Sequence, residues 1–180
     1  MRSSWINDEQ MRVVLAALMP VNRLVVECCL HSGLRVSDVL ELRTAKLKKR
    51  MCIRERKTGK SRRVTWPDRL LHEMQQGAGE VWVFPHRSDP ERHRSRCTVY
   101  QDLKRAQGIF QRSGLLPKAA QVSPHTARKI AAVRAYHHGG YEEARQLLNH
   151  DPAHAGTTLL YALADQMQPE PKKRRKRHGK

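Results

Sequence analysis

The sequence predicts a mainly α-helical domain of the α+β class, with one small antiparallel sheet of three strands. Three observations lead to this prediction. Apolar residues recur at helical spacing over most of the chain, Pro or Gly bounds many of these segments, and strand-like patterns are short and few. The length of 180 residues suits one domain with a proper core, which we place at residues 1–167, followed by a basic tail at 168–180.

Capping residues and chain breakers set the expected element bounds. Asn7 or Asp8 can cap the first helix, Pro20 opens the second, and Gly59 provides the turn of a hairpin in KTGK. The expected helices cover residues 9–19, 19–31, 36–43, 67–76, 97–113, 124–138, 141–149 and 157–167. The expected strands cover residues 51–56, 61–66 and 81–84. The tail after Met167 is rich in Pro, Lys and Arg, so we expect it to be disordered on its own.

The charge of the chain indicates a polyanionic partner. Lys and Arg number 35 against 17 Asp and Glu, a formal net charge of +18. The tail holds seven Lys or Arg and one Glu, so residues 1–167 keep +12 and are basic in their own right. Nucleic acid is the first candidate partner and an anionic membrane surface the second. We expect the tail to contact DNA.

Membrane, secretion and metal functions are not predicted. No apolar run approaches the ~20 residues of a membrane span, and the N-terminus lacks the apolar core of a secretory signal. The four cysteines show no CxxC pairing and the ten histidines form no HExxH motif, so we expect reduced thiols and no metal or cofactor. We expect a cytoplasmic, nucleoid-associated protein.

Five short segments carry side chains that can bind or attack a phosphate. SGLRVSD places Arg35 beside a glycine turn, with Asp38 three residues on, where it can pair with the guanidinium. In VSPHTARKI, Ser123 can cap a helix whose first turn brings two donors to one face. A helix N-terminus with such donors suits an anion. The candidate residues are Arg35, Lys57, His125, Arg128, His150 and, as nucleophile, Tyr161.

The order of these segments resembles the tyrosine recombinase or phage integrase family. SGLRVSDVLELR is similar to the first arginine box of the family, KTGKSRRV to its lysine hairpin, and VSPHTAR to its HxxR box. LLNHDPAHAGTTLLY is similar to its closing histidine and tyrosine segment. The resemblance covers about residues 10 to 165. It implies the helical catalytic domain of that family and a site-specific recombinase, which cleaves and rejoins double-stranded DNA without a cofactor.

The resemblance also implies how the DNA bond is broken. Tyr161 would attack the phosphorus and form a 3′-phosphotyrosyl link, which stores the bond until a new strand is joined. Lys57 would protonate the leaving 5′-oxygen, although Lys60 lies on the same turn and is the alternative.

The remaining residues would bind and orient the phosphate. Arg35 and Arg128 would hold its non-bridging oxygens, a task that suits the planar guanidinium. His125 would assist proton transfer, and His150 would donate a further hydrogen bond. Asp38 would hold Arg35 in place.

Two departures from the family pattern stand out. Lys129 follows the HxxR arginine, where many members have a second histidine. The connection between His150 and Tyr161 is slightly long, which leaves open whether Tyr161 acts in cis or on a neighbouring protomer. The chain is also similar to members that consist of a catalytic domain alone.

The partners expected from the resemblance are double-stranded DNA, further copies of the chain in a tetramer on paired sites, and accessory DNA-bending proteins. Two other functions stay open. One is DNA relaxation of the type IB topoisomerase kind, and the other is a non-catalytic DNA-binding regulator with the same fold. The outcome of recombination, whether integration, excision or inversion, does not follow from the sequence.

Overall fold

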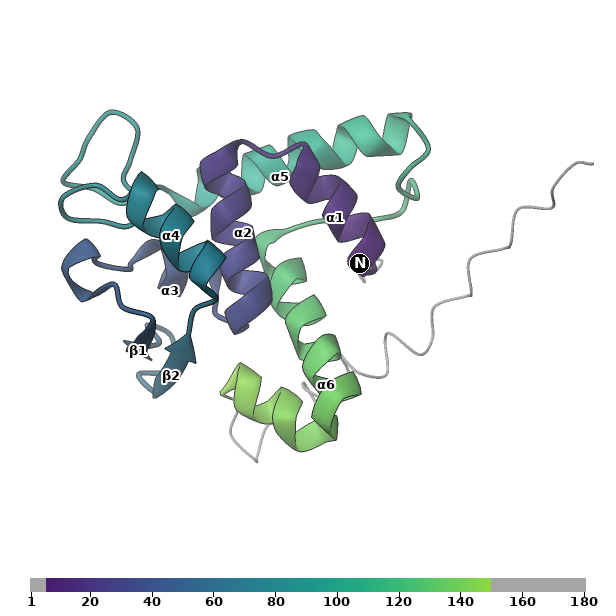
Figure 1. The fold of residues 1–180 in the computed structure, drawn as a ribbon. Helices are drawn as coiled ribbons and strands as arrows, with labels where there is room; N and C mark the ends of the chain where they lie inside the picture. Colours follow the sequence, from purple (N-terminus) through teal and green to yellow (C-terminus); the bar gives the residue numbers. More distant parts are fainter. Residues whose placement is uncertain (1–5, 150–180) are drawn as a thin grey trace, which may run out of the picture.

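The computed structural model describes residues 6–149 and shows a helical domain with a two-stranded hairpin (Figure 1). Its helices are α1 (Asp8–Ala16), α2 (Pro20–Ser32), α3 (Val36–Leu40), α4 (Asp68–Gly77), α5 (Arg96–Arg112) and α6 (Pro124–Leu148), with a 3-10 turn, η1, at Thr44–Lys46. The strands are β1 (Arg50–Arg54) and β2 (Ser61–Thr65). The mainly helical fold class predicted from the sequence is confirmed. The predicted final helix at 157–167 and the basic tail lie outside the described residues.

Helix α2 is the centre of the fold. Leu24, Val25, Val26, Cys28 and Cys29 are all buried, and together they cover more than one face of the helix. A helix that is apolar around most of its circumference has to be surrounded by other elements. Accordingly α2 packs against α6, α3, α4, α5 and α1, and in Figure 1 it runs through the middle of the molecule.

The predicted helix signals operate in the structure. The side-chain oxygen of Asn7 accepts a hydrogen bond from the backbone N–H of Gln10 at 2.9 Å, and the side-chain oxygen of Gln10 accepts one from the backbone N–H of Asn7 at 3.0 Å. This is a capping box, which satisfies two N–H groups that a helix start leaves unpaired. The predicted break in α6 is also present, because Gly139 and Gly140 have non-helical backbone angles. Helix α1 ends at Ala16, three residues earlier than predicted.

The hairpin presents one face to the core and the other to solvent. Ile53 of β1 and Val64 of β2 are buried, whereas Arg54 and Arg63 are exposed. Strands β1 and β2 pair antiparallel, and the backbone N–H of Gly59 donates to Glu55 O at 2.8 Å in the turn. The turn therefore projects from a fixed base at the edge of the domain.

The prediction of a third strand at residues 81–84 is wrong. Residues 81–84 do not join the hairpin; Trp82 forms an isolated bridge with Arg43 instead, and the guanidinium of Arg43 lies 3.6 Å above the Trp82 ring centroid. The bridge does not extend into a strand pair, because Thr44 begins η1 on one side and Pro85 follows Phe84 on the other. The apolar residues Val83 and Phe84 are buried in the core without strand pairing.

None of the helices in residues 6–149 is long and apolar enough to cross a membrane.

Gly33 joins α2 to the first arginine box in a conformation that favours glycine. Its φ is +64°, and an added Cβ would lie 3.0 Å from Leu147 Cγ. We expect Gly33→Ala to lower the free energy of unfolding by about 1–2 kcal/mol, because a left-handed residue with a Cβ is strained and Leu147 has to shift. Urea denaturation measures this change.

Gly77→Ala is the matched control, because a Cβ at Gly77 would meet nothing within 4 Å. Equal effects of the two substitutions would contradict the assigned strain at Gly33.

Candidate nucleic-acid cleavage site

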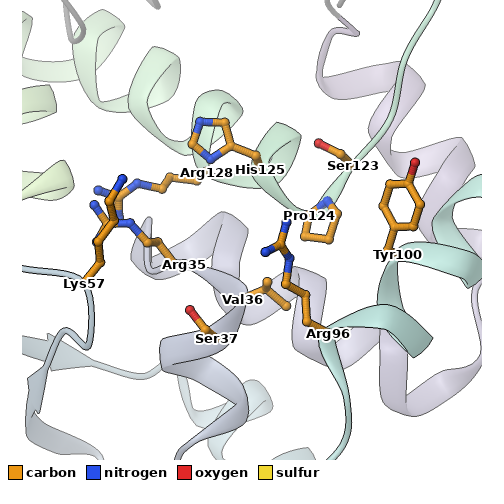
Figure 2. A pocket seen from close by; sticks show the side chains of 10 residues that line it. All are labelled: Arg35, Val36, Ser37, Lys57, Arg96, Tyr100, Ser123, Pro124, His125 and Arg128. Atoms are coloured by element: carbon orange, nitrogen blue, oxygen red, sulfur yellow. The ribbon is translucent and has the colours of Figure 1, made fainter.

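A cavity of about 280 Å³ brings three of the five predicted segments together (Figure 2). Its walls come from the start of α3, the hairpin turn, the start of α5 and the start of α6. The lining residues are Arg35, Val36, Ser37, Lys57, Arg96, Tyr100, Ser123, Pro124, His125 and Arg128. Four of the six candidate residues thus line one cavity, and none of its lining residues within 6–149 is acidic. His150 and Tyr161 lie outside the described residues.

Arg128 is held by backbone carbonyl groups. Its side chain is nearly fully buried; its two Nη atoms donate to the carbonyl oxygens of Gly33 and Leu148, the latter at 2.7 Å. These acceptors belong to the turn after α2 and to the end of α6. The guanidinium is therefore fixed at the wall of the cavity by two elements that pack on each other.

Arg35 pairs with a carboxylate that sequence reasoning missed. Its Nη1 donates to Glu55 Oε2, and Glu55 has no exposed surface. Arg62 lies on the other side, with its Nε 3.6 Å from Glu55 Oε1, and Asn149 Nδ2 donates to the same oxygen at 3.2 Å. Thr58 adds a long contact of 3.5 Å. One buried carboxylate therefore links the first arginine box, both sides of the hairpin and the end of α6.

The sequence contains a pattern that predicts a buried position for Glu55. Alternation along residues 51–55 places Glu55 on the same face as Met51 and Ile53, which is the core side of the hairpin. A carboxylate on that face needs cationic partners.

The predicted pairing of Asp38 with Arg35 is not what the structure shows. Asp38 is buried, and its Oδ1 accepts the backbone N–H of Arg56 at 3.0 Å. A helical turn directs the Asp38 side chain toward the hairpin, while Glu55 reaches Arg35 from the hairpin itself. Asp38 still supports the cavity, because its contact and that of Glu55 fix the two residues directly before Lys57.

Lys57 and Lys60 differ in position. Lys57 lines the cavity and Lys60 does not, although both belong to the same turn. This arrangement supports Lys57 as the lysine that acts on the phosphate.

Helix α6 begins as predicted, with Ser123 at the N-cap. Pro124 occupies the first position, as expected, and the backbone N–H of Ser123 donates to Thr126 Oγ1 at 3.0 Å. The helix directs His125 and Arg128 to the cavity (Figure 2).

Arg96 and Tyr100, one turn apart on α5, are the cavity residues with potential function that sequence reasoning missed. The loop before α5 has no periodicity from which their position could have been inferred. In Figure 2 the nitrogen atoms of Lys57, Arg35 and Arg128 lie on one side, and the Arg96 guanidinium lies apart from them.

The cavity holds His125 in its neutral form. Its pKa is lowered to about 4, and burial is the largest cause although part of the ring is open to solvent. The positive charge of Lys129 comes second, followed by Arg128, Arg35 and Lys57. At neutral pH the imidazole can therefore accept a proton as well as donate a hydrogen bond. Lys129, the residue directly after Arg128, thus acts on the site through its charge.

Within residues 6–149, no cluster of three or more His, Cys, Asp or Glu side chains is placed to hold a metal ion. The chemistry available to the described side chains is that of arginine, lysine and histidine on an anion.

This fold and cavity match a known class of DNA-processing proteins. The model of the phage integrase family matches residues 4–167, so the chain belongs to that family, and its fold is that of the tyrosine recombinase catalytic domain. A search of curated proteins gives no match.

Solved structures with the same fold include proteins bound to DNA. A lambda integrase dimer bound to a COC′ core site is 19% identical, with a TM-score of 0.73, covering 95% of this chain and 63% of that one. A lambda integrase tetramer bound to a Holliday junction is 20% identical, with a TM-score of 0.70 and coverages of 88% and 48%. The XerH site-specific recombinase bound to difH is 17% identical, with a TM-score of 0.66 and coverages of 88% and 50%. The chain thus spans less than two thirds of these relatives.

The His125 titration tests the electrostatics of the cavity. We expect its NMR signal to titrate with a midpoint of about 4 in the DNA-free protein, because burial and then the neighbouring cations disfavour the charged ring and lower its pKa. His138 is an internal reference, since Glu143 raises its pKa above the ordinary value. The unfolded chain protonates near pH 6.5, so His125 destabilises the folded state progressively as the pH falls from about 6.5 to about 4.

The variant His125→Gln assigns the signal by removing it. A midpoint near that of an ordinary histidine would contradict the cationic environment described for the cavity.

Proposed function

We propose that the chain is a site-specific DNA recombinase that cleaves and rejoins DNA through a 3′-phosphotyrosyl intermediate. The observation that carries the proposal is that Arg35, Lys57, His125 and Arg128 line one cavity, where no acidic side chain of the described residues 6–149 is present. Such a cavity attracts an anion, and these are the residue types that the family resemblance assigns to the phosphate. The DNA-bound relatives of the same fold support DNA as the substrate.

The proposed reaction exchanges one phosphoester for another. The Tyr161 oxygen forms a bond to phosphorus, the bond from phosphorus to the 5′-oxygen breaks, and Lys57 gives that oxygen a proton. Neutral His125 accepts the phenol proton, directly or through water. The reverse sequence joins a new 5′-hydroxyl and releases the tyrosine, so no ATP is consumed.

Charge stabilisation supplies the rest of the catalysis. Arg35 and Arg128 bind the non-bridging oxygens, on which negative charge builds up in the transition state. Both guanidinium groups are held by contacts on their far side, from Glu55 and from backbone carbonyls. They therefore need little reorganisation when the phosphate enters. His150 donates a further hydrogen bond in this proposal.

We further propose that the active unit is a homo-tetramer on paired sites in the cytoplasm. The Holliday-junction tetramer of lambda integrase supports this assembly. Accessory DNA-bending proteins remain a prediction from the family resemblance.

Substitution of the proposed nucleophile gives the first test. Nicked suicide substrates made from DNA flanking the gene release the short 5′ fragment and trap any covalent complex. We expect the native protein to give an adduct that survives denaturant, and Tyr161→Phe to bind DNA normally and give none, because it lacks the attacking oxygen. The adduct is measured by gel electrophoresis, and sequencing of the trapped DNA identifies the site.

Tyr100→Phe is the matched variant, since Tyr100 is the tyrosine that lines the cavity in residues 6–149. We expect it to form the adduct. If Tyr100→Phe gave no adduct while Tyr161→Phe still gave one, the nucleophile would be Tyr100 on α5. Salt-sensitive binding with no adduct in the native protein would favour the non-catalytic regulator, and relaxed but unrecombined plasmid would favour the topoisomerase.

The role of Lys57 is tested by changing the leaving group. We expect Lys57→Ala to slow cleavage by at least about a hundredfold on ordinary DNA, the usual size of general acid catalysis. A substrate with sulfur in place of the bridging 5′-oxygen should restore the rate. A thiol ionises near pH 8.5 and water near 15.7, so a thiolate leaves without protonation.

Lys60→Ala is the control from the same turn, and we expect it to cleave both substrates at near-native rates. Rescue by sulfur in Lys60→Ala, with Lys57→Ala unaffected, would assign the acid to Lys60.

A further inference from the structure

Arg96 stands in the cavity as a cation that the proposed reaction does not use. It lies at the first position of α5, opposite the turn that carries Lys57, and its side chain is exposed. In the part of the chain that the structure describes, its guanidinium has no ion pair and no hydrogen bond to another side chain. Its charge is available to a ligand.

Some exposed arginines elsewhere in the described domain are paired with carboxylates. Arg69 contacts Glu27 and Glu73, and Arg134 contacts Asp8 at 2.6 Å. Arg96 differs from these in its surroundings, because it lines a cavity with three other cations, and none of the cavity's lining residues within 6–149 is acidic.

Arg96 also lines a second cavity beside the first. This second cavity has a volume of about 440 Å³ and shares Ser37, Lys57 and Arg96 with the first. One carboxylate, Glu41, also lines the second cavity, and it is paired with Arg56 of the hairpin at 2.9 Å. The hollow thus continues past the proposed scissile phosphate, and Arg96 is the unpaired arginine at the junction of its two parts.

We propose that Arg96 binds a second DNA phosphate, the one next to the scissile phosphate on the cleaved strand. The proposal deepens the proposed function and rests on it, since it takes the first cavity to hold the scissile phosphate. A DNA strand carries one charge per phosphate, so a strand that delivers one phosphate to Arg35 and Arg128 brings its neighbours along the hollow. Arg96 is a binding residue in this scheme. It contributes to affinity for the strand, and it takes no part in bond breaking.

The first arm of the test measures binding and needs no cleavage. The full-length protein is titrated with a mixed-sequence duplex of ~30 bp, long enough for one protomer, at several salt concentrations. We expect Arg96→Gln to weaken binding about tenfold at low salt and to reduce the slope of log K against log salt by about 0.9, the value for one lost phosphate contact.

Arg112→Gln is the matched control, because Arg112 is exposed at the opposite end of α5 and its loss changes the net charge equally. We expect its slope to stay native. Equal effects of the two substitutions on the salt slope would overturn the proposal, because the loss of net charge would then explain the effect of Arg96→Gln.

The second arm uses the site obtained from the trapped adduct. Duplexes carry one uncharged methylphosphonate at the phosphate on either side of the scissile one. At one of these positions we expect the methylphosphonate and Arg96→Gln to have non-additive effects on binding, because each removes the same contact. Single-turnover cleavage at saturating protein should stay within about threefold of native, since uniform binding raises affinity without changing the chemical step.

Additive effects at both positions would overturn the proposal, and so would a cleavage defect of Arg96→Gln at saturation. If the native protein gives no adduct while the salt slopes still differ, the recombinase proposal fails and phosphate binding by Arg96 stands.

Discussion

The buried carboxylate of Glu55 is the interaction on which the rest of the site depends. It contacts Arg35, Arg62 and Asn149, which come from the turn after α2, from β2 and from the residue that ends α6. A buried ion pair gives little net stability because desolvation costs about as much as the attraction returns, but removal of one partner leaves an uncompensated charge. Glu55 therefore contributes geometry more than stability, by holding three separate parts of the chain in one arrangement.

That arrangement produces a cavity with a surplus of positive charge. Glu55 is fully buried and does not line the cavity. Among the lining residues within 6–149, the cations therefore face no carboxylate. The surplus lowers the pKa of His125, with burial as the larger cause. An incoming phosphate removes the repulsion, so ligand binding and the protonation of His125 are linked: the anion favours the charged ring. The cavity thus carries an excess of positive charge that a bound anion offsets.

The hairpin turn is also fixed by contacts with the rest of the domain. The side chain of Glu55 accepts a hydrogen bond from Arg35, and the backbone N–H of Arg56 donates one to Asp38. The next residue, Lys57, is then placed at the cavity while its own side chain stays exposed. A catalytic acid in the proposed reaction has to reach a leaving oxygen and then release it, and a mobile lysine on a fixed backbone suits that task.

The sequence by itself determined the helical class, the hairpin, the caps at Asn7 and Ser123, the break at Gly139 and Gly140, and the candidate phosphate ligands, because these depend on local periodicity and on motif spacing. The tertiary structure decided which partners those ligands have. Glu55 rather than Asp38 contacts Arg35, Trp82 forms a bridge with Arg43 instead of joining the hairpin, and Arg96 enters the cavity from the first position of α5. Each of these contacts joins residues 20 or more positions apart, and the register between distant elements is set by packing around α2, which no local pattern records.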